Sequence, residues 1–205
     1  MSKMTRQKGL VLGVTGAAGS GKSTVTQMLS SLGAQTIDAD ALVRWAYNDS
    51  AFRGRVVARF GDGILDCRGG VDRGKLADIV FQNPEALADL EGLVHPAVLD
   101  QMAESIEMYR AEPERAPVLA VEVPLLFEAG ADTMVDRVLT VTVGPETRAR
   151  RLAERGWDAE RIAAVDRSQM PLSEKAARAD YVVETDGTLE DTAARVEALW
   201  RRMVE

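Results

Sequence analysis

Short apolar runs alternate with longer amphipathic stretches along most of the chain. Val25, Met28, Leu29 and Leu32 recur at helical spacing, so residues 23–32 are predicted to form a helix that ends at Gly33. Short apolar segments separated by helices are typical of a mainly parallel sheet covered on both faces. The predicted strands are residues 9–14, 35–37, 118–123, 137–143 and 181–183.

The region between the second and third predicted strands is too long for a single crossover, which suggests an inserted helical subdomain. Phe52, Val56 and Phe60 form one apolar stripe within it. Asn83-Pro84 and His95-Pro96 are both predicted to begin helices, because proline fits the first helical position. Further helices are expected over residues 145–155 and 158–170. The last helix should open with a capping box at residues 188–191.

Composition narrows the class of protein. Apolar residues make up 46% of the chain, so a disordered protein is excluded. The formal net charge of −7 argues against a broad nucleic-acid-binding surface. The single cysteine, Cys67, has no partner for an internal disulfide and is interpreted as an incidental thiol in a surface turn. The first apolar run is too short for a membrane span or a signal core, so a cytosolic protein without membrane association is predicted.

A phosphate-binding motif follows the first predicted strand. Residues 16–23 read GAAGSGKS and match G-x-x-x-x-G-K-[ST], with a predicted strand before them and a predicted helix after them. Peptide N–H groups of such a loop wrap a phosphate, the lysine brings a charge to the β- and γ-phosphates, and the serine hydroxyl reaches Mg²⁺. This placement favours nucleotide binding over a chance match. The predicted ATP-binding residues are Gly16, Gly19, Ser20, Gly21, Lys22, Ser23 and Thr24, with Ser23 as the Mg²⁺ ligand.

Two aspartates, Asp38 and Asp40, lie at the carboxyl end of the second predicted strand, where open α/β sheets bind their ligands. Phosphorylation of a hydroxyl needs a carboxylate that orients it and accepts its proton. Alternatively, Asp40 caps a helix that begins at Ala41, and Asp38 supports a turn. The sequence pattern leaves both interpretations open.

Three arginines, Arg148, Arg151 and Arg155, share one face of a predicted helix. Such a row can bind phosphoryl charge, although a solvated helix face has the same pattern. Glu122 lies within an apolar strand, where its burial is costly unless it faces magnesium or a basic partner. His95 is the only histidine of the chain. It is a candidate for a functional role, and an ordinary structural role is the alternative interpretation.

Taken in order, the motifs resemble the dephospho-coenzyme A kinase family from Leu10 to about Val196. The phosphate loop is generic, whereas I-D-A-D, H-P and P-L-L-F-E together are specific to the family. The segments that carry the resemblance are residues 16–24, 37–40, 93–96, 123–128, 148–155, 169–171 and 179–181.

The resemblance implies an α/β P-loop kinase fold related to nucleoside monophosphate kinases, with a five-stranded, mainly parallel sheet. The implied parts are a nucleotide-binding core (residues 8–40, 115–145 and 178–205), a helical CoA-binding insertion (41–114) and a mobile helical lid (146–177). The implied reaction transfers phosphate from Mg²⁺-bound ATP to the ribose 3′-hydroxyl of dephospho-CoA, the last step of coenzyme A synthesis. A monomer or weak homo-oligomer is expected.

The resemblance also assigns roles to individual residues. Asp40 is the expected base, and Lys22 and Arg151 complete the catalytic set. Asp38, His95 and Glu128 are expected on the acceptor side, and Arg148 and Arg155 are expected to contact phosphates from the lid. Residues 184–187 read ETDG where relatives often have D-N-x-G, so no adenine contact is assigned there.

Two other functions compete with this interpretation. Residues 66–69 match the D-x-x-G motif of GTPases, but they do not follow a strong strand, and the chain has no N-K-x-D motif. A kinase for another small molecule, such as a nucleotide or a sugar acid, is the rival within the same enzyme class. A purely structural role leaves Lys22 and the two aspartates unexplained.

Overall fold

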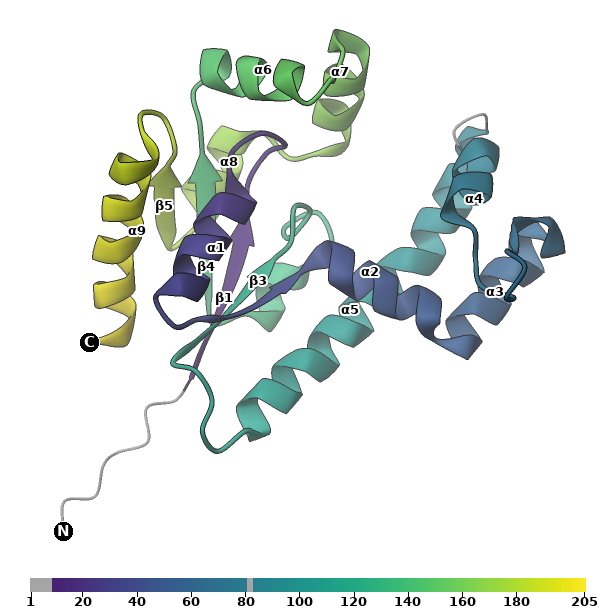
Figure 1. Cartoon of the computed structure of the whole chain (residues 1–205), viewed down its shortest axis with the longest axis horizontal. Coiled ribbons are helices and arrows are strands. Elements are labelled where there is room, and N and C mark those ends of the chain that lie inside the picture. Colours follow the sequence, from purple (N-terminus) through teal and green to yellow (C-terminus); the bar gives the residue numbers. More distant parts are fainter. Residues whose placement is uncertain (1–8, 81–82) are drawn as a thin grey trace. The chain divides into compact units, whose positions relative to one another are not determined.

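The computed structural model describes residues 9–80 and 83–205, without the side chains of residues 39 and 40. The strands are β1 Leu10–Thr15, β2 Gln35–Asp38, β3 Val118–Glu122, β4 Arg137–Thr142 and β5 Tyr181–Glu184. The α-helices are α1 Lys22–Ser31, α2 Ala39–Asn48, α3 Ser50–Phe60, α4 Arg73–Val80, α5 Pro84–Ala111, α6 Pro145–Glu154, α7 Ala159–Ser168, α8 Leu172–Arg178 and α9 Leu189–Val204. Two short 3₁₀ turns, η1 Asp62–Ile64 and η2 Ala131–Met134, complete the described elements (Figure 1).

The five strands form one sheet in the order β2-β3-β1-β4-β5, and every pair is parallel. This confirms the predicted fold class. The central strands β1 and β3 are buried almost throughout, which explains why they are continuous apolar runs rather than alternating ones. Because all strands run the same way, their carboxyl ends lie along one edge of the sheet, where the phosphate loop begins.

One face of the sheet packs against α1 and α9 (Figure 1). Val25 and Leu29 of α1 and Val196 and Leu199 of α9 belong to the same buried cluster as the sheet residues. The capping box expected at the start of α9 is confirmed, since Thr188 and Asp191 exchange hydrogen bonds. Among the residues described, no helix combines the length and apolar character that crossing a membrane requires.

The chain divides into two compact units. One runs to Asp38 and resumes at Met108, so it contains the whole sheet, and the other covers Ala39–Glu107. The second unit is helical and has its own core around Phe52, Val56, Ile64 and Leu76.

One predicted helix start is wrong. His95-Pro96 does not begin a helix, because α5 continues from Pro84 through Pro96 to Ala111. An internal proline costs a helix about 3 kcal/mol. Apolar residues on both sides of Pro96, including Leu90, Leu93 and Ala97, pack against the core of the helical unit, and this burial outweighs the lost hydrogen bond. The start predicted at Pro84 is confirmed.

Two further differences affect the candidate site. Helix α2 begins at Ala39 rather than Ala41, so Asp40 lies in its first turn and does not precede it. The short helix α8, which the apolar pattern did not predict, follows α7 and packs against β4.

Candidate active site

The loop between β1 and α1 has the tight curvature expected for binding phosphate. Gly16, Gly19 and Gly21 have φ angles of 148°, 79° and 88°, a region that side-chain-bearing residues rarely adopt. At Gly16 an added Cβ would also collide with the carbonyl oxygen of Val141. Gly21 immediately precedes the first turn of α1.

The carbonyl oxygens of residues 16–21 in this loop each accept a hydrogen bond from another group of the protein. The oxygens of Gly16 and Ala17 accept hydrogen bonds from Lys22 Nζ, both at 3.0 Å. Those of the next four residues are bonded in turn by Arg148, Arg151, Thr185 and the N–H of Val25. With its carbonyl oxygens held in this way, the loop is pre-organised to offer its N–H groups to an anion.

Lys22 is almost completely buried. Burial lowers the pKa of its ammonium group from 10.5 to about 8, although the nearby Glu122 carboxylate opposes the shift. The positive charges of Lys175, Arg155 and Arg148 add to the lowering. Burial makes the charged form of Lys22 costly in free energy, so an incoming phosphate anion should stabilise the ammonium group strongly.

Ser23 and Glu122 meet beside Lys22. Ser23 Oγ donates a hydrogen bond of 3.0 Å to Glu122 Oε1. Glu122 is the last residue of β3 and pairs in register with Asp38, the last residue of β2. A hydroxyl and a carboxylate so close together at the phosphate loop fit Mg²⁺, which takes one or two carboxylates and completes its shell with phosphates and water. The buried carboxylate of Glu122 therefore has Ser23 as a hydrogen-bond donor and the positive charge of Lys22 nearby.

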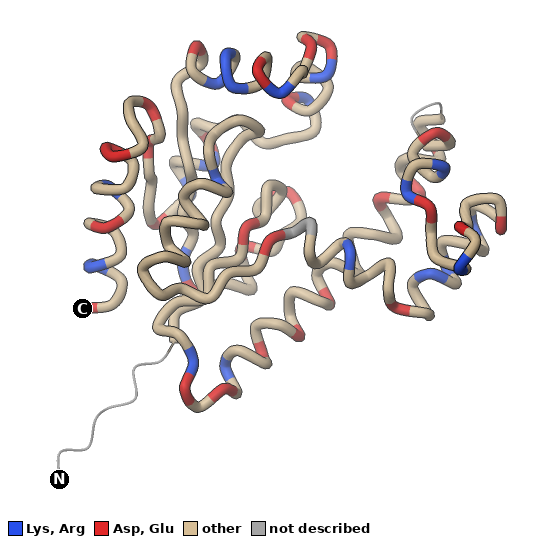
Figure 2. Tube along the Cα trace, viewed as in Figure 1, with Lys and Arg blue, Asp and Glu red and all other residues tan. Residues whose placement is uncertain are grey.

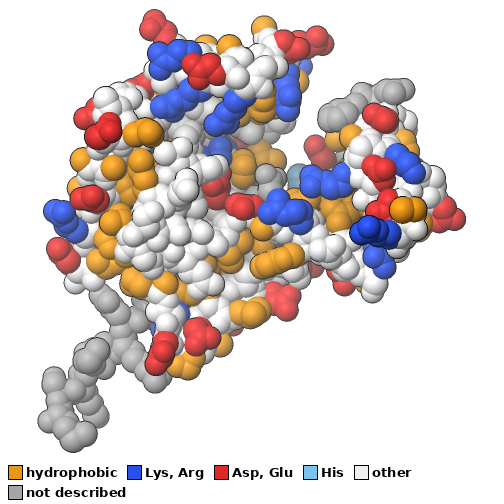
Figure 3. Space-filling view, in the orientation of Figure 1, with side chains coloured by type: hydrophobic (Ala, Val, Ile, Leu, Met, Phe, Trp, Pro, Cys, Tyr) orange, Lys and Arg blue, Asp and Glu red, His pale blue; other side chains and the backbone are white. Residues whose placement is uncertain are grey.

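The three arginines of the predicted row, which are Arg148 and Arg151 of α6 and Arg155 at its C-cap, make different contacts. Arg148 donates to Ala18 O at 2.8 Å and forms an ion pair with Asp166 of α7. Arg151 donates to Gly19 O at 3.4 Å, to Thr185 Oγ1 at 2.9 Å and to Thr185 O at 2.7 Å. Arg155 borders a small hollow at the loop together with Lys22 and Ser23. Figure 2 shows basic residues along this helix with acidic ones among them, and Figure 3 shows side chains of both signs on the surface in this region. The contacts of Arg148 and Arg151 exclude a purely solvated face.

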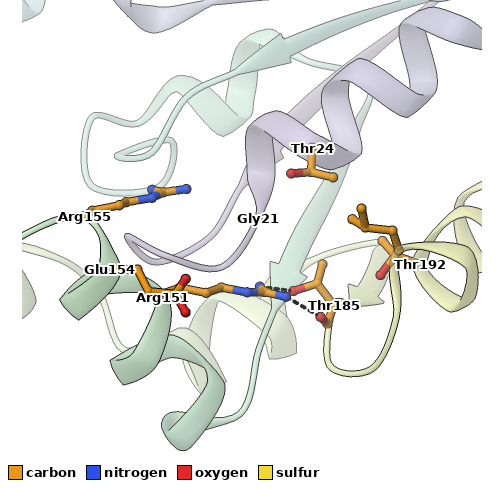
Figure 4. Close-up of a pocket in the computed structure, with 8 residues that line it drawn as sticks. Gly21, Thr24, Arg151, Glu154, Arg155, Thr185 and Thr192 are labelled. Atoms are coloured by element: carbon orange, nitrogen blue, oxygen red, sulfur yellow. Dashed lines mark hydrogen bonds between the residues drawn. The ribbon is translucent and has the colours of Figure 1, made fainter.

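A pocket of about 240 Å³ opens next to the loop. Arg151 lies along its wall with the guanidinium pointing at Thr185, and Arg155 lies on the side of α6 (Figure 4). The lining residues are Gly21, Thr24, Arg151, Glu154, Arg155, Thr185, Leu189 and Thr192.

For the residues predicted on the acceptor side, the structure gives less direct evidence than it gives for the phosphate loop. Glu128 accepts hydrogen bonds from the buried Lys175 Nζ at 2.8 Å and from the N–H of Met170 at 2.7 Å. Burial opposes the shift, but these bonds hold the pKa of Glu128 below its usual value. Asp40 and His95 belong to the helical unit, and the side chain of Asp40 is outside the described residues. The role of Asp40 as the base and that of His95 on the acceptor side stay predictions.

Sequence reasoning did not find Thr185 and Lys175 as parts of this site. Lys175 Nζ is fully buried and donates to Pro124 O at 2.6 Å, and the same oxygen accepts a bond from Thr15, which immediately precedes the phosphate loop. Both residues act through partners that are far away in sequence. Thr185 lies in the segment 184–187, where the departure from D-N-x-G removed the one local signal, and no motif marks Lys175.

The fold and the loop define a protein with the P-loop kinase fold. A shikimate kinase from Acinetobacter baumannii shares the fold, with a TM-score of 0.54 at 15% identity over 96% of this chain and 95% of that one. The dephospho-CoA kinase family model matches residues 10–191. The chain therefore belongs to the dephospho-CoA kinase family.

Individual relatives agree with this assignment. The dephospho-CoA kinase of Syntrophotalea carbinolica is 43% identical over 95% of this chain and 92% of its own length. The solved structure of dephospho-CoA kinase from Campylobacter jejuni superimposes with a TM-score of 0.72 at 25% identity, covering 95% of this chain and 96% of that one.

Proposed function

We propose that this protein transfers the γ-phosphoryl group of ATP to the ribose 3′-hydroxyl of dephospho-CoA, giving CoA and ADP. The observation that carries the proposal is the cluster of Lys22, Ser23 and Glu122 at a phosphate loop, in a chain that belongs to the dephospho-CoA kinase family. In the reaction, a bond forms between the 3′-oxygen and the γ-phosphorus, and the bond from that phosphorus to the β–γ bridging oxygen breaks. ADP leaves with the bond electrons.

The residues of the chain divide the work. The N–H groups of Gly16–Thr24 and the Lys22 ammonium bind the phosphates of ATP. Arg151, with Arg148 and Arg155, stabilises the charge that develops on the transferred group. Asp40 orients the 3′-hydroxyl and accepts its proton, while Asp38, His95 and Glu128 contribute to the acceptor side.

Mg²⁺ fits the donor set of Ser23 and Glu122, which lie 3.0 Å apart. When bound, the metal neutralises charge on the β- and γ-phosphates. Ser23 would bind it through the hydroxyl oxygen, and Glu122 would hold it directly or through water. We place the reaction in the cytoplasm, with ATP and dephospho-CoA as the partners and no nucleic acid or membrane involved, in a monomer or weak homo-oligomer.

The decisive experiment compares acceptors. Purified protein with Mg²⁺ and ATP should form CoA and ADP from dephospho-CoA, and it should act much more slowly on nucleoside monophosphates and gluconate. Product analysis should place the new phosphate on the ribose 3′ position. Vigorous phosphorylation of another acceptor without CoA formation would overturn the proposal.

Asp40 provides the sharpest test of the acceptor side. Asp40→Asn removes the group that accepts the proton, so kcat should fall about 10²- to 10⁴-fold with both substrates saturating. Positioning matters more than basicity in a loose phosphoryl transfer, which favours the lower end of that range. Because asparagine caps or opens a helix about as well as aspartate, the melting temperature should hardly change.

Asp38→Asn is the matched control, with a carboxylate lost two residues earlier and a smaller expected fall in kcat. If Asp40→Asn turned over at nearly the wild-type rate, Asp40 would be a structural residue of α2, and the base would have to be another group.

A further inference from the structure

Thr185, at the end of β5, connects three elements through one hydroxyl group. Its Oγ1 donates to Ser20 O of the phosphate loop at 2.7 Å and accepts a hydrogen bond from Arg151 of α6 at 2.9 Å. Thr142 O of β4 lies 3.2 Å from the same oxygen. The residue is 3% exposed, so water cannot easily replace these partners.

The direction of these bonds follows from the hydroxyl inventory. A threonine hydroxyl has one proton and two lone pairs. Thr142 O already accepts the N–H of Thr185 at 2.9 Å, so the hydroxyl proton belongs to the shorter bond with Ser20 O. The lone pairs are then left to face the guanidinium of Arg151, whose other N–H group is bound by the carbonyl oxygen of Thr185 itself.

The backbone around Thr185 is fixed from both sides. Asp186 accepts the N–H of Gly144, which precedes α6, at 2.5 Å. Arg195 of α9 donates to the carbonyl oxygens of Glu184 and Asp186 at 2.9 and 3.1 Å. A side chain held on such a rigid segment can hold others to within a fraction of an ångström.

We infer that Thr185 is a positioning residue. Its hydroxyl group holds both the phosphate loop, at Ser20, and the guanidinium group of Arg151 in place before nucleotide binds. The inference rests on the kinase function proposed above. Figure 4 shows the two residues meeting on one wall of the pocket beside Gly21. Without the hydroxyl, Ser20 O loses a buried donor and Arg151 loses one of its three acceptors.

The test uses Thr185→Val, which keeps the shape and removes the hydroxyl, and Thr185→Ser, which keeps the hydroxyl. We expect Thr185→Val to lower kcat/KM for ATP about 10- to 100-fold, because a buried bond to a charged group is lost and a carbonyl is left without its donor. Thr185→Ser should stay within about threefold of wild type. If the valine variant does not fold, Thr185→Ala serves in its place with the same expectation.

Thr140→Val is the matched control. Thr140 is a fully buried threonine of β4, and its hydroxyl donates to Lys175 O rather than to the phosphate loop. Its loss should lower the melting temperature by a similar amount and leave kcat/KM for ATP almost unchanged. Equal effects of Thr140→Val and Thr185→Val on both quantities would show that Thr185 only stabilises the fold.

A double-mutant cycle shows whether Thr185 works through Arg151. Adding Thr185→Val to Arg151→Ala should reduce kcat/KM by a smaller factor than Thr185→Val does in the wild type, because only the bond to Ser20 O is then left to lose. Losses that multiply would overturn the inference.

Mg²⁺-ATP dissociation constants measured by calorimetry for the same variants separate this inference from the kinase function. Thr185→Val should weaken binding about 3- to 10-fold, whichever acceptor the wild-type enzyme uses. Wild-type protein that fails to phosphorylate dephospho-CoA contradicts only the proposed function, whereas unchanged ATP binding and kinetics in Thr185→Val contradict only the role of Thr185.

Discussion

Lys22 at the end of the phosphate loop and the arginines of helix α6 bond neighbouring carbonyl groups of this loop, but the two sets of contacts are encoded in different ways. Lys22 reaches Gly16 O and Ala17 O across only five or six residues of sequence. Arg148 and Arg151 reach the next two carbonyls from 130 and 132 residues away. The contacts of Lys22 are therefore determined by the local sequence of the loop, whereas those of α6 form only when the folded sheet brings this helix to the loop. Substitutions on the two sides should differ accordingly.

The largest effect is expected within the loop. Lys22→Ala removes a charge whose interaction strengthens in the transition state, at a cost of about 2–4 kcal/mol, or roughly 30- to 1,000-fold in kcat. The melting temperature should change little, because the two lost bonds to loop carbonyls are offset by the removal of a buried ammonium group that is costly to the folded protein. Steady-state kinetics and thermal melts check both statements. Nearly normal turnover would show that the catalytic phosphate site lies elsewhere.

On the helix side, Arg151→Ala should lower kcat about 10- to 100-fold, with little change in the KM for dephospho-CoA. Arg148→Ala is the comparison, because Arg148 bonds the neighbouring carbonyl but is also paired with Asp166. We expect a smaller loss of kcat for Arg148→Ala. If Arg151→Ala changed only the melting temperature, the contacts of Arg151 with Gly19 and Thr185 would be structural, and Arg155 would be the next candidate for the phosphate contact.

These two sides also mark what the sequence could predict. The motif at residues 16–23 predicted the loop, its glycines and Lys22, because these residues are contiguous and Lys22 bonds carbonyls only five and six residues before it. The spacing of Arg148, Arg151 and Arg155 predicted a shared face but not the partners, since Thr185 and the loop carbonyls come from other elements. The three central strands β1, β3 and β4 followed from apolar runs, which indicate burial, whereas β2 is short and largely exposed. Pro96 was misread because packing in the helical unit overrides a local helix signal.

The acidity of Lys22 provides a test that spans both sides, because burial lowers its pKa to about 8 and the charges of Arg155 and Arg148 add smaller contributions. ATP binds the protonated lysine, so its dissociation constant should rise above pH 8, by at most about tenfold per pH unit. The unfolded chain keeps this proton up to about pH 10.5, so Lys22 should also make the free energy of unfolding rise with pH between about 8 and 10.5.

Calorimetric titrations with ATP and denaturant melts across this pH range measure the two effects. Lys22→Met is the control, since it has no proton to lose and should remove both dependences. A wild-type dissociation constant that stayed flat from pH 8 to 9.5 would show that the ammonium is not a ligand of the phosphates.

The smallest effect is expected from a substitution that distinguishes the two contacts of Arg148, which are the ion pair with Asp166 and the hydrogen bond to Ala18 O. Asp166 of α7 pairs with Arg148, but its side chain is 43% exposed, whereas that of Arg148 is 18% exposed. An exposed ion pair contributes at most about 1 kcal/mol and less at high salt. Asp166→Asn should therefore lower the free energy of unfolding by less than about 1 kcal/mol and leave kcat within about threefold of wild type, because Ala18 O still holds Arg148. Denaturant melts and kinetics at low and high salt check this. A loss of kcat as large as that of Arg148→Ala would mean that α7, and not the phosphate loop, places the arginines of α6.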